Sequence, residues 1–375
     1  MGSEATKREV LEKKLEKRLQ DPKTEPLISL PLDFLEEITC GFSTDQELGR
    51  GACGVVYKGV LRSGKAIAVK KISDTHLLGN DNQVENQIIC LTEVRHQNVV
   101  QLVGYCVETK SEVVEHSGKH VLAEKRACLL CFQFLCNGSL DKHLSDDTLG
   151  LDWDERYKVI RGVCRGLHYL HDKRNIVHRD LKPQNILMDD TMMPKIADFD
   201  LSRLMSQEKS RTVTAKLQGT PGYMAPECIE QRSISFEADI FSLGVIIIEI
   251  ITGRRDYPNI SETFETSLKH YTDKVVGSWR NRLVEITPVH MSPEMCIQQV
   301  QQCISVALKC LEHESNKRPT SLDIIEILNA VEPKCTSPGN PPNSIEKEYY
   351  MADIQAYQFL PTDQGHISFE RELSP

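Results

Sequence analysis

Two kinds of hydrophobic pattern divide the chain near residue 135. Before that point, short apolar runs are separated by turns, and the runs at 55–60 and 66–72 meet at Ser63-Gly64. Short strand-like runs joined by a tight turn predict a hairpin. After that point, apolar residues recur at helical spacing, as they do from Trp153 to His171. Residues 241–251 are almost all apolar and predict a buried core helix.

The other elements of the fold follow from the same kinds of pattern. Residues 82–94 predict a helix, and the runs at 99–106 and 128–135 predict a pair of strands. The connection between these two strands, residues 107–126, is long and polar. We therefore expect it to protrude from the fold.

The two ends of the chain are expected to lie outside the main folded unit. Residues 7–20 predict a short amphipathic helix with a solvated face, because Leu11, Leu15 and Leu19 recur every four residues. Residues 21–32 hold three prolines and predict a linker, which a helical turn at 33–39 follows. The predicted division is an N-terminal extension and linker at 1–35, a folded domain at 36–331 whose lobes are about 36–135 and 136–331, and a flexible tail at 332–375.

Composition places the chain among intracellular globular proteins. Of its 375 residues 40% are hydrophobic, and a net charge of -9 argues against nucleic acid as a partner. Its 13 cysteines are scattered and follow no secretory signal, which predicts reduced thiols in the cytoplasm and not a disulfide framework. The pair Cys128 and Cys131 is expected to pack in the core, and Cys296, Cys303 and Cys310 are expected to lie buried near one face of a helix.

We expect no transmembrane segment, because the most apolar run, residues 241–251, is short and contains Glu249. The first six residues fit the pattern for N-myristoylation, with Gly2 as the acceptor. Because the pattern is short, a chance match and a real signal both stay open. If Gly2 is myristoylated, the protein would be peripheral at the plasma membrane, and one acyl chain would anchor it only weakly.

A polar loop between two apolar runs carries the chemistry. Residues 178–185 read HRDLKPQN and supply an acid at Asp180, a cation at Lys182 and an amide at Asn185. Phosphoryl transfer needs these three groups together: an acid to accept the proton of the attacking hydroxyl, a cation to spread phosphate charge, and an amide oxygen to hold a metal ion.

This loop and four further motifs resemble the protein kinase family. In chain order the other motifs are LGRGACGVVYKG at 48–59, AVK at 68–70, IADFD at 196–200 and GTPGYMAPE at 219–227. Their wording is most similar to that of the plant receptor-like kinases, which are related to the Pelle and interleukin-receptor-associated kinases. The resemblance implies an α+β, bilobal fold, with a small β-rich N-lobe holding one main helix and a larger α-helical C-lobe. Because neither an ectodomain nor a membrane helix is predicted, a receptor-like cytoplasmic kinase is the closer match.

The resemblance also implies which residues form the site. Asp180 would orient the acceptor hydroxyl and take its proton, while Lys182 and Lys70 would hold phosphates. Asn185 and Asp198 would bind Mg²⁺, with Mn²⁺ as an alternative. The nucleotide-binding set expected for ATP is Leu48, Gly49, Gly51, Gly54, Val56, Ala68, Lys70, Phe132, Gln133, Leu135 and Leu187. Two structural pairs are implied as well: Glu227 with Arg318, and Asp239 with the backbone of the catalytic loop.

Residues 201–218 resemble an activation segment, since they are polar and include Ser206, Ser210, Thr212 and Thr214. Arg179 precedes the catalytic acid and could pair with a phosphate on this segment, for which Thr214 is the expected main site. Lys182 and the GTPGYMAPE segment favour serine or threonine over tyrosine as acceptor. The expected partners are ATP, protein substrates and a membrane receptor kinase.

Two residues depart from the family pattern in ways that bear on activity. The helix at 82–94 presents Gln87 where the family has the glutamate that pairs with Lys70, and Glu85 lies roughly 200° around that helix. Asp200 stands where the family has glycine, while Cys53 at the tip of the glycine-rich loop is a minor departure. We interpret Gln87 as aiming Lys70 without charge, so Gln87→Glu is expected to raise the rate. Two functions stay open: an active serine/threonine kinase, and a pseudokinase scaffold with weak or no turnover.

Overall fold

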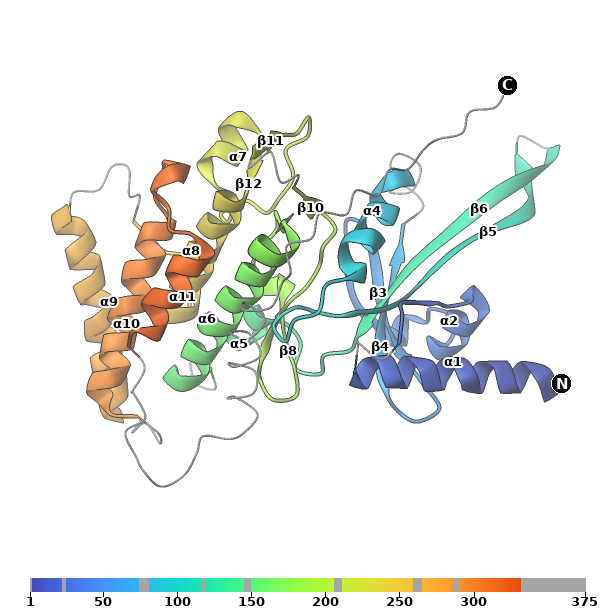
Figure 1. The fold of residues 1–375 in the computed structure, drawn as a ribbon, viewed down its shortest axis with the longest axis horizontal. Coiled ribbons are helices and arrows are strands. Elements are labelled where there is room, and N and C mark those ends of the chain that lie inside the picture. Colours follow the sequence, from blue (N-terminus) through green and yellow to red (C-terminus); the bar gives the residue numbers. More distant parts are fainter. Residues whose placement is uncertain are drawn as a thin grey trace, which may run out of the picture. The chain divides into compact units, whose positions relative to one another are not determined.

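A computed structural model of the chain describes residues 2–21, 25–73, 81–116, 119–144, 150–205, 211–258, 265–285 and 291–331. The strand-rich part comes first and the helical part second, which confirms the predicted α+β fold with a small N-lobe and a larger C-lobe (Figure 1). The predicted tail at 332–375 lies outside the described residues.

The N-lobe is built on a six-stranded sheet whose strands lie in the order β1-β5-β6-β4-β3-β2. Its strands are β1 (Ile28–Ser29), β2 (Glu47–Gly51), β3 (Gly54–Val60), β4 (Ala66–Ile72), β5 (Leu102–His116) and β6 (Lys119–Gln133). Its helices are α1 (Gly2–Gln20), α2 (Leu32–Ile38), the short 3-10 turn Thr44–Gln46 and α4 (Asp81–Thr92). The hairpin predicted at 55–72 is β3 paired antiparallel with β4, with Val60 opposite Ala66.

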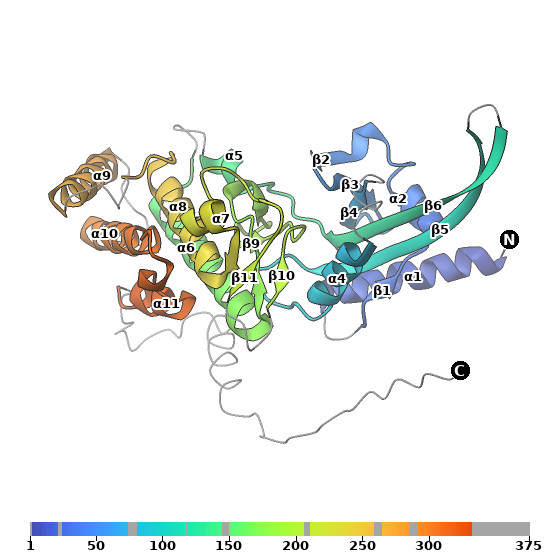
Figure 2. The ribbon, with the colours of Figure 1, turned by 90° about the horizontal axis from the view of Figure 1, so that it is seen from above.

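The connection predicted between β5 and β6 is itself β-structure. The two strands continue as an antiparallel arm well past residues 106 and 128, with Val113 opposite Leu122. Figures 1 and 2 show the arm extending beyond the rest of the sheet, so it does protrude. Polarity hid these strands because both faces of the arm meet solvent: the consecutive residues Lys110 and Ser111 point to opposite faces and are both exposed.

The first residues of the chain were predicted to be a separate extension, but they pack onto the N-lobe. The predicted amphipathic helix is α1, whose Leu15 is fully buried, with Leu11 and Leu19 packed beside it. The predicted linker contains β1, which pairs parallel with β5 through Ile28 and Gly104, so this expectation was wrong for the described residues. Residues before and after the predicted boundary at 35/36 therefore share one hydrophobic cluster.

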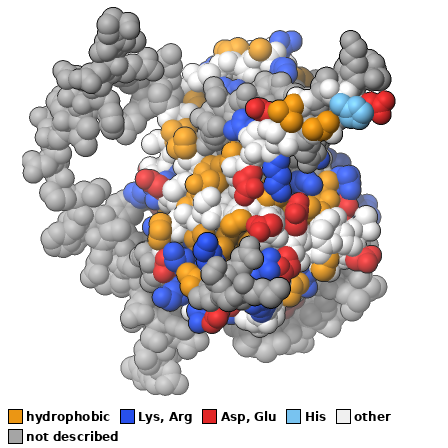
Figure 3. All heavy atoms as spheres, turned by 90° about the vertical axis from the view of Figure 1, so that its right-hand side faces the viewer, with side chains coloured by type: hydrophobic (Ala, Val, Ile, Leu, Met, Phe, Trp, Pro, Cys, Tyr) orange, Lys and Arg blue, Asp and Glu red, His pale blue; other side chains and the backbone are white. Residues whose placement is uncertain are grey.

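A buried arginine fixes α1 to the sheet. Arg18 is 1% exposed, and its Nη2 donates to the carbonyl oxygen of Leu102 at 3.1 Å. A second guanidinium nitrogen donates to the carbonyl oxygen of Glu25. The helix is therefore held by its leucine row and by charge-assisted hydrogen bonds. Figure 3 looks onto this end of the N-lobe, where Lys and Arg side chains are interspersed with Asp and Glu.

The C-lobe packs its helices around the nearly all-apolar α8 (Phe236–Thr252), which is the predicted core helix. The other helices are α5 (Leu140–Leu144), α6 (Trp153–His168) with a π-turn at Tyr169–Lys173, α7 (Pro226–Gln231), α9 (Glu265–Glu285), α10 (Pro293–Cys310) and α11 (Ser321–Asn329), with 3-10 turns at Pro183–Asn185 and Ser315–Lys317. Six short strands pair in twos: β7 (Ile176–Val177) with β10 (Arg203–Leu204), β8 (Ile186–Met188) with β9 (Pro194–Ile196), and β11 (Arg211–Val213) with β12 (Ser233–Ser235). None of the helices within the described ranges is long and apolar enough to cross a membrane.

Local sequence signals explain where two of the C-lobe helices, α6 and α11, begin. Asp152 caps α6: its carboxylate accepts from the backbone N–H of Glu155 at 2.8 Å, and the Glu155 carboxylate accepts in return from the Asp152 N–H at 3.0 Å. Thr320 and Asp323 form the same reciprocal cap on α11. Such a cap satisfies backbone donors that have no partner inside the helix. Cys296, Cys303 and Cys310 are buried on α10, and Cys128 and Cys131 are buried in the sheet, as predicted.

A half-buried histidine where the two lobes join makes stability depend on pH. The ring of His96 stacks on Tyr169 at 4.9 Å, its Nδ1 accepts from the N–H of Asn98, and burial lowers its pKa to about 4. As pH falls through about 6.5, the unfolded histidine gains a proton that the folded one does not take until about pH 4. We therefore expect the free energy of unfolding to fall between pH 7 and 5 by roughly 1 to 2 kcal/mol more in the wild type than in His96→Gln. Urea unfolding at both pH values checks this, and equal losses in the two proteins would refute it.

Candidate active site

The glycine-rich turn between β2 and β3 is shaped to leave its backbone uncovered. A Cβ built on Gly49 or Gly51 would meet nothing within 4 Å, whereas one on Gly54 would lie 2.1 Å from the carbonyl oxygen of Lys71. Gly54 is therefore required by the close approach of β4, and the other two leave open the space that a side chain would fill. Cys53 is buried at the tip, and burial together with the charge of Asp200 raises the pKa of its thiol to about 12.

The residues expected around adenine lie on adjoining strands. In the sheet, Val56 on β3 is opposite Lys70, and Ala68 on β4 is opposite Phe132 on β6. The backbone N–H of Gln133 donates to the carbonyl oxygen of Gln101 at 3.0 Å, so that N–H is already bonded within the sheet. The remaining expected members lie on other parts of the chain: Leu48 on β2, Leu135 just after β6, and Leu187 on β8 of the C-lobe.

The catalytic loop is held from below by one buried carboxylate on α8. Asp239, which is 1% exposed, accepts from the backbone N–H of His178 at 2.7 Å and from that of Arg179 at 2.8 Å. It also lies 3.0 Å from Nε2 of His171. Arg179 has a φ of 72°, a conformation that an L-residue adopts at a cost and that these bonds stabilise. The brace implied by the family resemblance is thus present.

Three polar side chains meet at Asp180. Its Oδ2 accepts from Nζ of Lys182 at 2.7 Å and from Nδ2 of Asn185 at 3.1 Å. Its Oδ1 accepts from the Thr220 hydroxyl at 2.6 Å, and Lys182 also donates to that hydroxyl oxygen at 2.8 Å. Thr220 was missed by the sequence analysis. The signal for it was its place directly after Gly219 in the GTPGYMAPE motif.

Lys70 reaches across from the N-lobe to two carboxylates of the segment after β9. Its Nζ lies 2.6 Å from Oδ1 of Asp198 and 2.6 Å from Oδ2 of Asp200. Burial acts to lower the pKa of the Lys70 ammonium, but the two carboxylates outweigh it and raise the pKa above its ordinary value. Burial likewise acts to raise the pKa of Asp200, and Lys70 holds it below its ordinary value. The charged forms of Lys70 and Asp200 therefore stabilise each other in this cluster.

The sequence predicted that Gln87 contacts Lys70, but the structure pairs Gln87 with Asp200 instead. Nε2 of Gln87 donates to Oδ1 of Asp200 at 3.1 Å, and among the described residues Lys70 bonds to the two aspartates. Sequence spacing placed Gln87 on the correct side of α4 but gave no sign that Asp200 would stand between. The backbone of Glu85 belongs to α4, and its side chain lies outside the described residues.

A buried ion pair joins α7 to the loop before α11. Two guanidinium nitrogens of Arg318 donate to the two carboxylate oxygens of Glu227 at 2.6 and 2.8 Å. The side chain of Arg318 is 0% exposed and that of Glu227 is 6% exposed. This is the pair implied by the family resemblance, and it fixes the end of the activation segment to the C-lobe core.

Comparison with known proteins agrees with this geometry. A family model described as the protein kinase domain matches residues 42–329. The chain belongs to the protein kinase family. Phe199, which follows Asp198, lies with its ring 5.0 Å from that of His178, so this kinase packs the aromatic of its IADFD motif against the catalytic loop.

Relatives of this kinase include receptor-like kinases of Arabidopsis thaliana. Cysteine-rich receptor-like protein kinase 44 is 36% identical over 323 residues, which cover 84% of this chain and 79% of that protein. Cysteine-rich receptor-like protein kinase 29 is 37% identical over 82% of this chain and 43% of its own length, and number 41 is 36% identical over 81% and 44%. The chain thus spans less than half of the last two relatives. The predicted kinship with plant receptor-like kinases is confirmed.

The kinase domain implies ATP and a divalent metal ion, and the residues present fit both. The open space beside Gly49 and Gly51 leaves room for phosphates close to the backbone, and Lys70 adds a cation. Asp198 and Asn185 offer carboxylate and amide oxygens, the ligand type that Mg²⁺ prefers. Among the described residues no group of three His, Cys, Asp or Glu side chains forms a metal site. An ion here would therefore rely on these two side chains together with phosphate oxygens.

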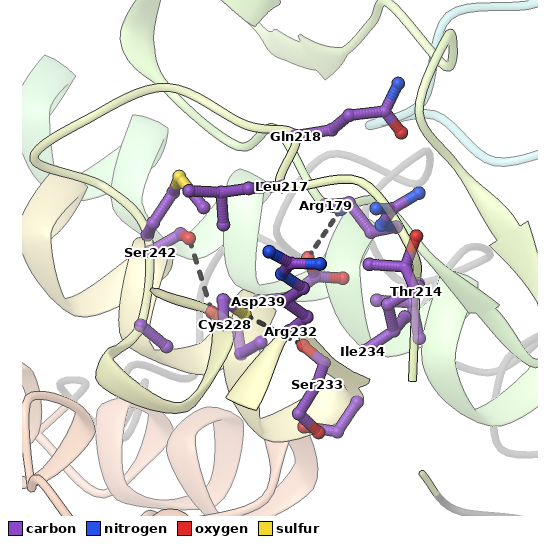
Figure 4. A pocket seen from close by; sticks show the side chains of 15 residues that line it. Arg179, Thr214, Leu217, Gln218, Cys228, Arg232, Ser233, Ile234, Asp239 and Ser242 are labelled. Carbon is purple, nitrogen blue, oxygen red and sulfur yellow. Dashed lines mark hydrogen bonds between the residues drawn. The ribbon is translucent and has the colours of Figure 1, made fainter. Parts of the chain in front are cut away.

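The described part of the activation segment borders a pocket that contains two arginines. Thr214, Arg179 and Arg232 all line this pocket, and Figure 4 shows them converging on it from different elements. Thr214 is half-buried, its N–H donates to the carbonyl oxygen of Arg232 at 3.0 Å, and its hydroxyl donates to that of Lys216 at 3.3 Å. The predicted Ser206 and Ser210 lie outside the described residues.

Proposed function

We propose that this kinase transfers the γ-phosphoryl group of ATP to serine or threonine hydroxyls of proteins, in receptor-linked signalling. The observation that carries the proposal is the arrangement of Asp180, which one cation and one amide fix in place on a braced loop. Asp180 would orient the acceptor hydroxyl and accept its proton, and Lys182 beside it would balance negative charge at the reacting oxygens.

The remaining site residues would hold the nucleotide. Lys70 and the glycine-rich turn would position the phosphates, and the side chains from Val56 to Leu187 named above would enclose adenine. Asp198 and Asn185 would hold Mg²⁺, with Mn²⁺ as an alternative. When bound, the ion would neutralise charge on the phosphates.

Serine/threonine preference is supported by the contact of Lys182 with Asp180 and Thr220, since Lys182 and the GTPGYMAPE segment are the features that favoured it. The receptor-like names of the relatives support a membrane receptor kinase as an upstream partner. A cytoplasmic location belongs to the same proposal. The pseudokinase alternative gains no support, because Lys70, Asp180, Asn185 and Asp198 are all present and Lys70 is paired. Myristoylation of Gly2 stays a prediction that labelling with myristate would test.

The test is transfer of ³²P from ATP by the purified chain in the presence of Mg²⁺ or Mn²⁺, with an Asp180→Asn protein as the control. Acid hydrolysis of the product then identifies the labelled amino acid. Phosphoserine or phosphothreonine that disappears in the control is expected. Phosphotyrosine alone would refute the acceptor preference, and no label above the control would favour the scaffold.

Autophosphorylation is expected within residues 206–220, mainly on Thr214, because that hydroxyl borders the pocket that holds Arg179 and Arg232. Mass spectrometry after incubation with ATP and Mg²⁺ should find the phosphate there, and Thr214→Ala should remove most of it. Thr212→Ala, two residues earlier on β11, is the matched control. Phosphate found only in the two terminal segments would contradict the prediction.

A further inference from the structure

The two departures of this kinase from its family pattern meet in space. Asp200 lies between Lys70 and Gln87: its Oδ2 is 2.6 Å from Nζ of Lys70, and its Oδ1 accepts from Nε2 of Gln87 at 3.1 Å. The side chain of Lys70 is 10% exposed and that of Asp200 12% exposed, while Gln87 is half-buried. The positions are 113 residues apart in the chain, so their meeting is a result of folding.

We propose that Asp200 is the positioning residue for Lys70 and replaces the acid that the family carries on α4. The family pattern places one acid on the helix and glycine after the aromatic, whereas this chain places an amide on the helix and the acid after Phe199. Positions 87 and 200 together therefore offer Lys70 one negative charge, as they do in the family pattern. The inference rests on the proposed function, because Lys70 is the same phosphate-binding lysine.

The chemistry of Gln87 suits this exchange. An amide can donate a hydrogen bond to Asp200, which a carboxylate at the same place cannot do. Glutamate at position 87 would set a third negative group beside Asp198 and Asp200, within 3.1 Å of one of them. Like charges at that distance repel strongly in a shielded site. Gln87→Glu alone should therefore lower the rate, which reverses the expectation drawn from the sequence.

The backbone accepts an aspartate at position 200. Among the described residues with positive φ, the nearest is Asp198 at 62°, and Asp200 is not one of them. Glycine's conformational freedom is thus not used at position 200 in this structure. Through Asp200, the helix α4 is tied to the segment that carries Asp198, so the helix and the lysine are positioned by one carboxylate.

The test compares four proteins: wild type, Asp200→Gly, Gln87→Glu, and the double variant that restores the family pattern. Nucleotide affinity is measured by calorimetry with ADP and Mg²⁺, phosphoryl transfer gives kcat and KM for ATP, and thermal melting checks the fold. Asp200→Gly should lower kcat/KM by about 10- to 150-fold, the range for losing a hydrogen bond to a charged group. Gln87→Glu should lower it by roughly 5-fold or more. The double variant should recover most of the loss, which a merely structural role would not produce.

Two further variants keep the outcome decisive. Asp190→Asn removes an exposed acid of the same lobe and should match the wild type. If Asp200→Gly melts early, Asp200→Asn provides the same loss of charge with the shape retained. The proposal is overturned if the Asp200 variants keep wild-type affinity and rate, or if the double variant is no better than Asp200→Gly. If the wild type shows no transfer that depends on Asp180, the proposed function fails, and the ADP affinities still decide the role of Asp200. A wild type that binds no ADP would overturn both.

Discussion

Asp180→Asn is expected to lower phosphoryl transfer by roughly 10²- to 10⁴-fold, the range usual for losing a positioned general base. The amide retains the shape of the carboxylate and one oxygen that can accept from Lys182. It cannot take the proton of the acceptor hydroxyl, and it removes the negative charge that holds Lys182 and Thr220 in place. The measurement is steady-state transfer to a protein or peptide substrate at saturating ATP.

Controls separate this effect from damage to the fold. ADP affinity and melting temperature should stay close to wild-type values, because Lys70 and the glycine-rich turn are untouched. Near-native turnover in the Asp180→Asn protein would show that the base has been assigned to the wrong residue. Lys70→Met provides the complementary variant, since it should weaken both nucleotide binding and turnover.

Arg318→Met is expected to destabilise the domain by about 3 to 5 kcal/mol, the range for breaking a buried ion pair. Its guanidinium bonds both oxygens of Glu227 and also donates to the carbonyl oxygens of Glu312, His313 and Glu237. Methionine fills much of the volume but leaves a buried carboxylate without its counter-charge. Urea unfolding followed by circular dichroism measures the change.

The neighbouring lysine provides a matched control for this loss. Lys317 pairs with Glu314 at 2.6 Å, but the side chains of both residues are more than half exposed. Exposed pairs contribute little to stability, so Lys317→Met should unfold at nearly the wild-type urea concentration. An Arg318→Met protein that unfolded together with Lys317→Met would show that the buried pair does not stabilise the domain.

The parts of the structure that the sequence predicts well are those encoded by contiguous residues. The hairpin of β3 and β4, the amphipathic α6 and the apolar α8 each follow from a local pattern. The catalytic loop can be recognised from eight adjacent residues. Through the family resemblance, these residues also predict the fold of the protein and its division into two lobes. Its brace, Asp239, could be named for the same reason.

The parts that were missed depend on contacts between distant residues. Polar residues at 107–126 gave no sign that they pair with one another, because an exposed two-stranded arm lacks the usual apolar face. Arg18 reads as a surface residue until Leu102, 84 positions away, supplies a carbonyl oxygen to it. The link from Gln87 to Asp200 was hidden for the same reason, since each residue alone looks like the loss of a family feature.

The arm formed by β5 and β6 has a consequence for colloidal behaviour. In the part of the chain that the structure describes, its outer residues pair only with each other, so each strand presents an open edge of backbone groups. Such an edge can recruit a strand from another molecule and start aggregation. Exposed charges at Lys110, Glu115, Glu124 and Lys125 line the arm. They would have to be desolvated in any such pairing, and they therefore keep neighbouring molecules apart.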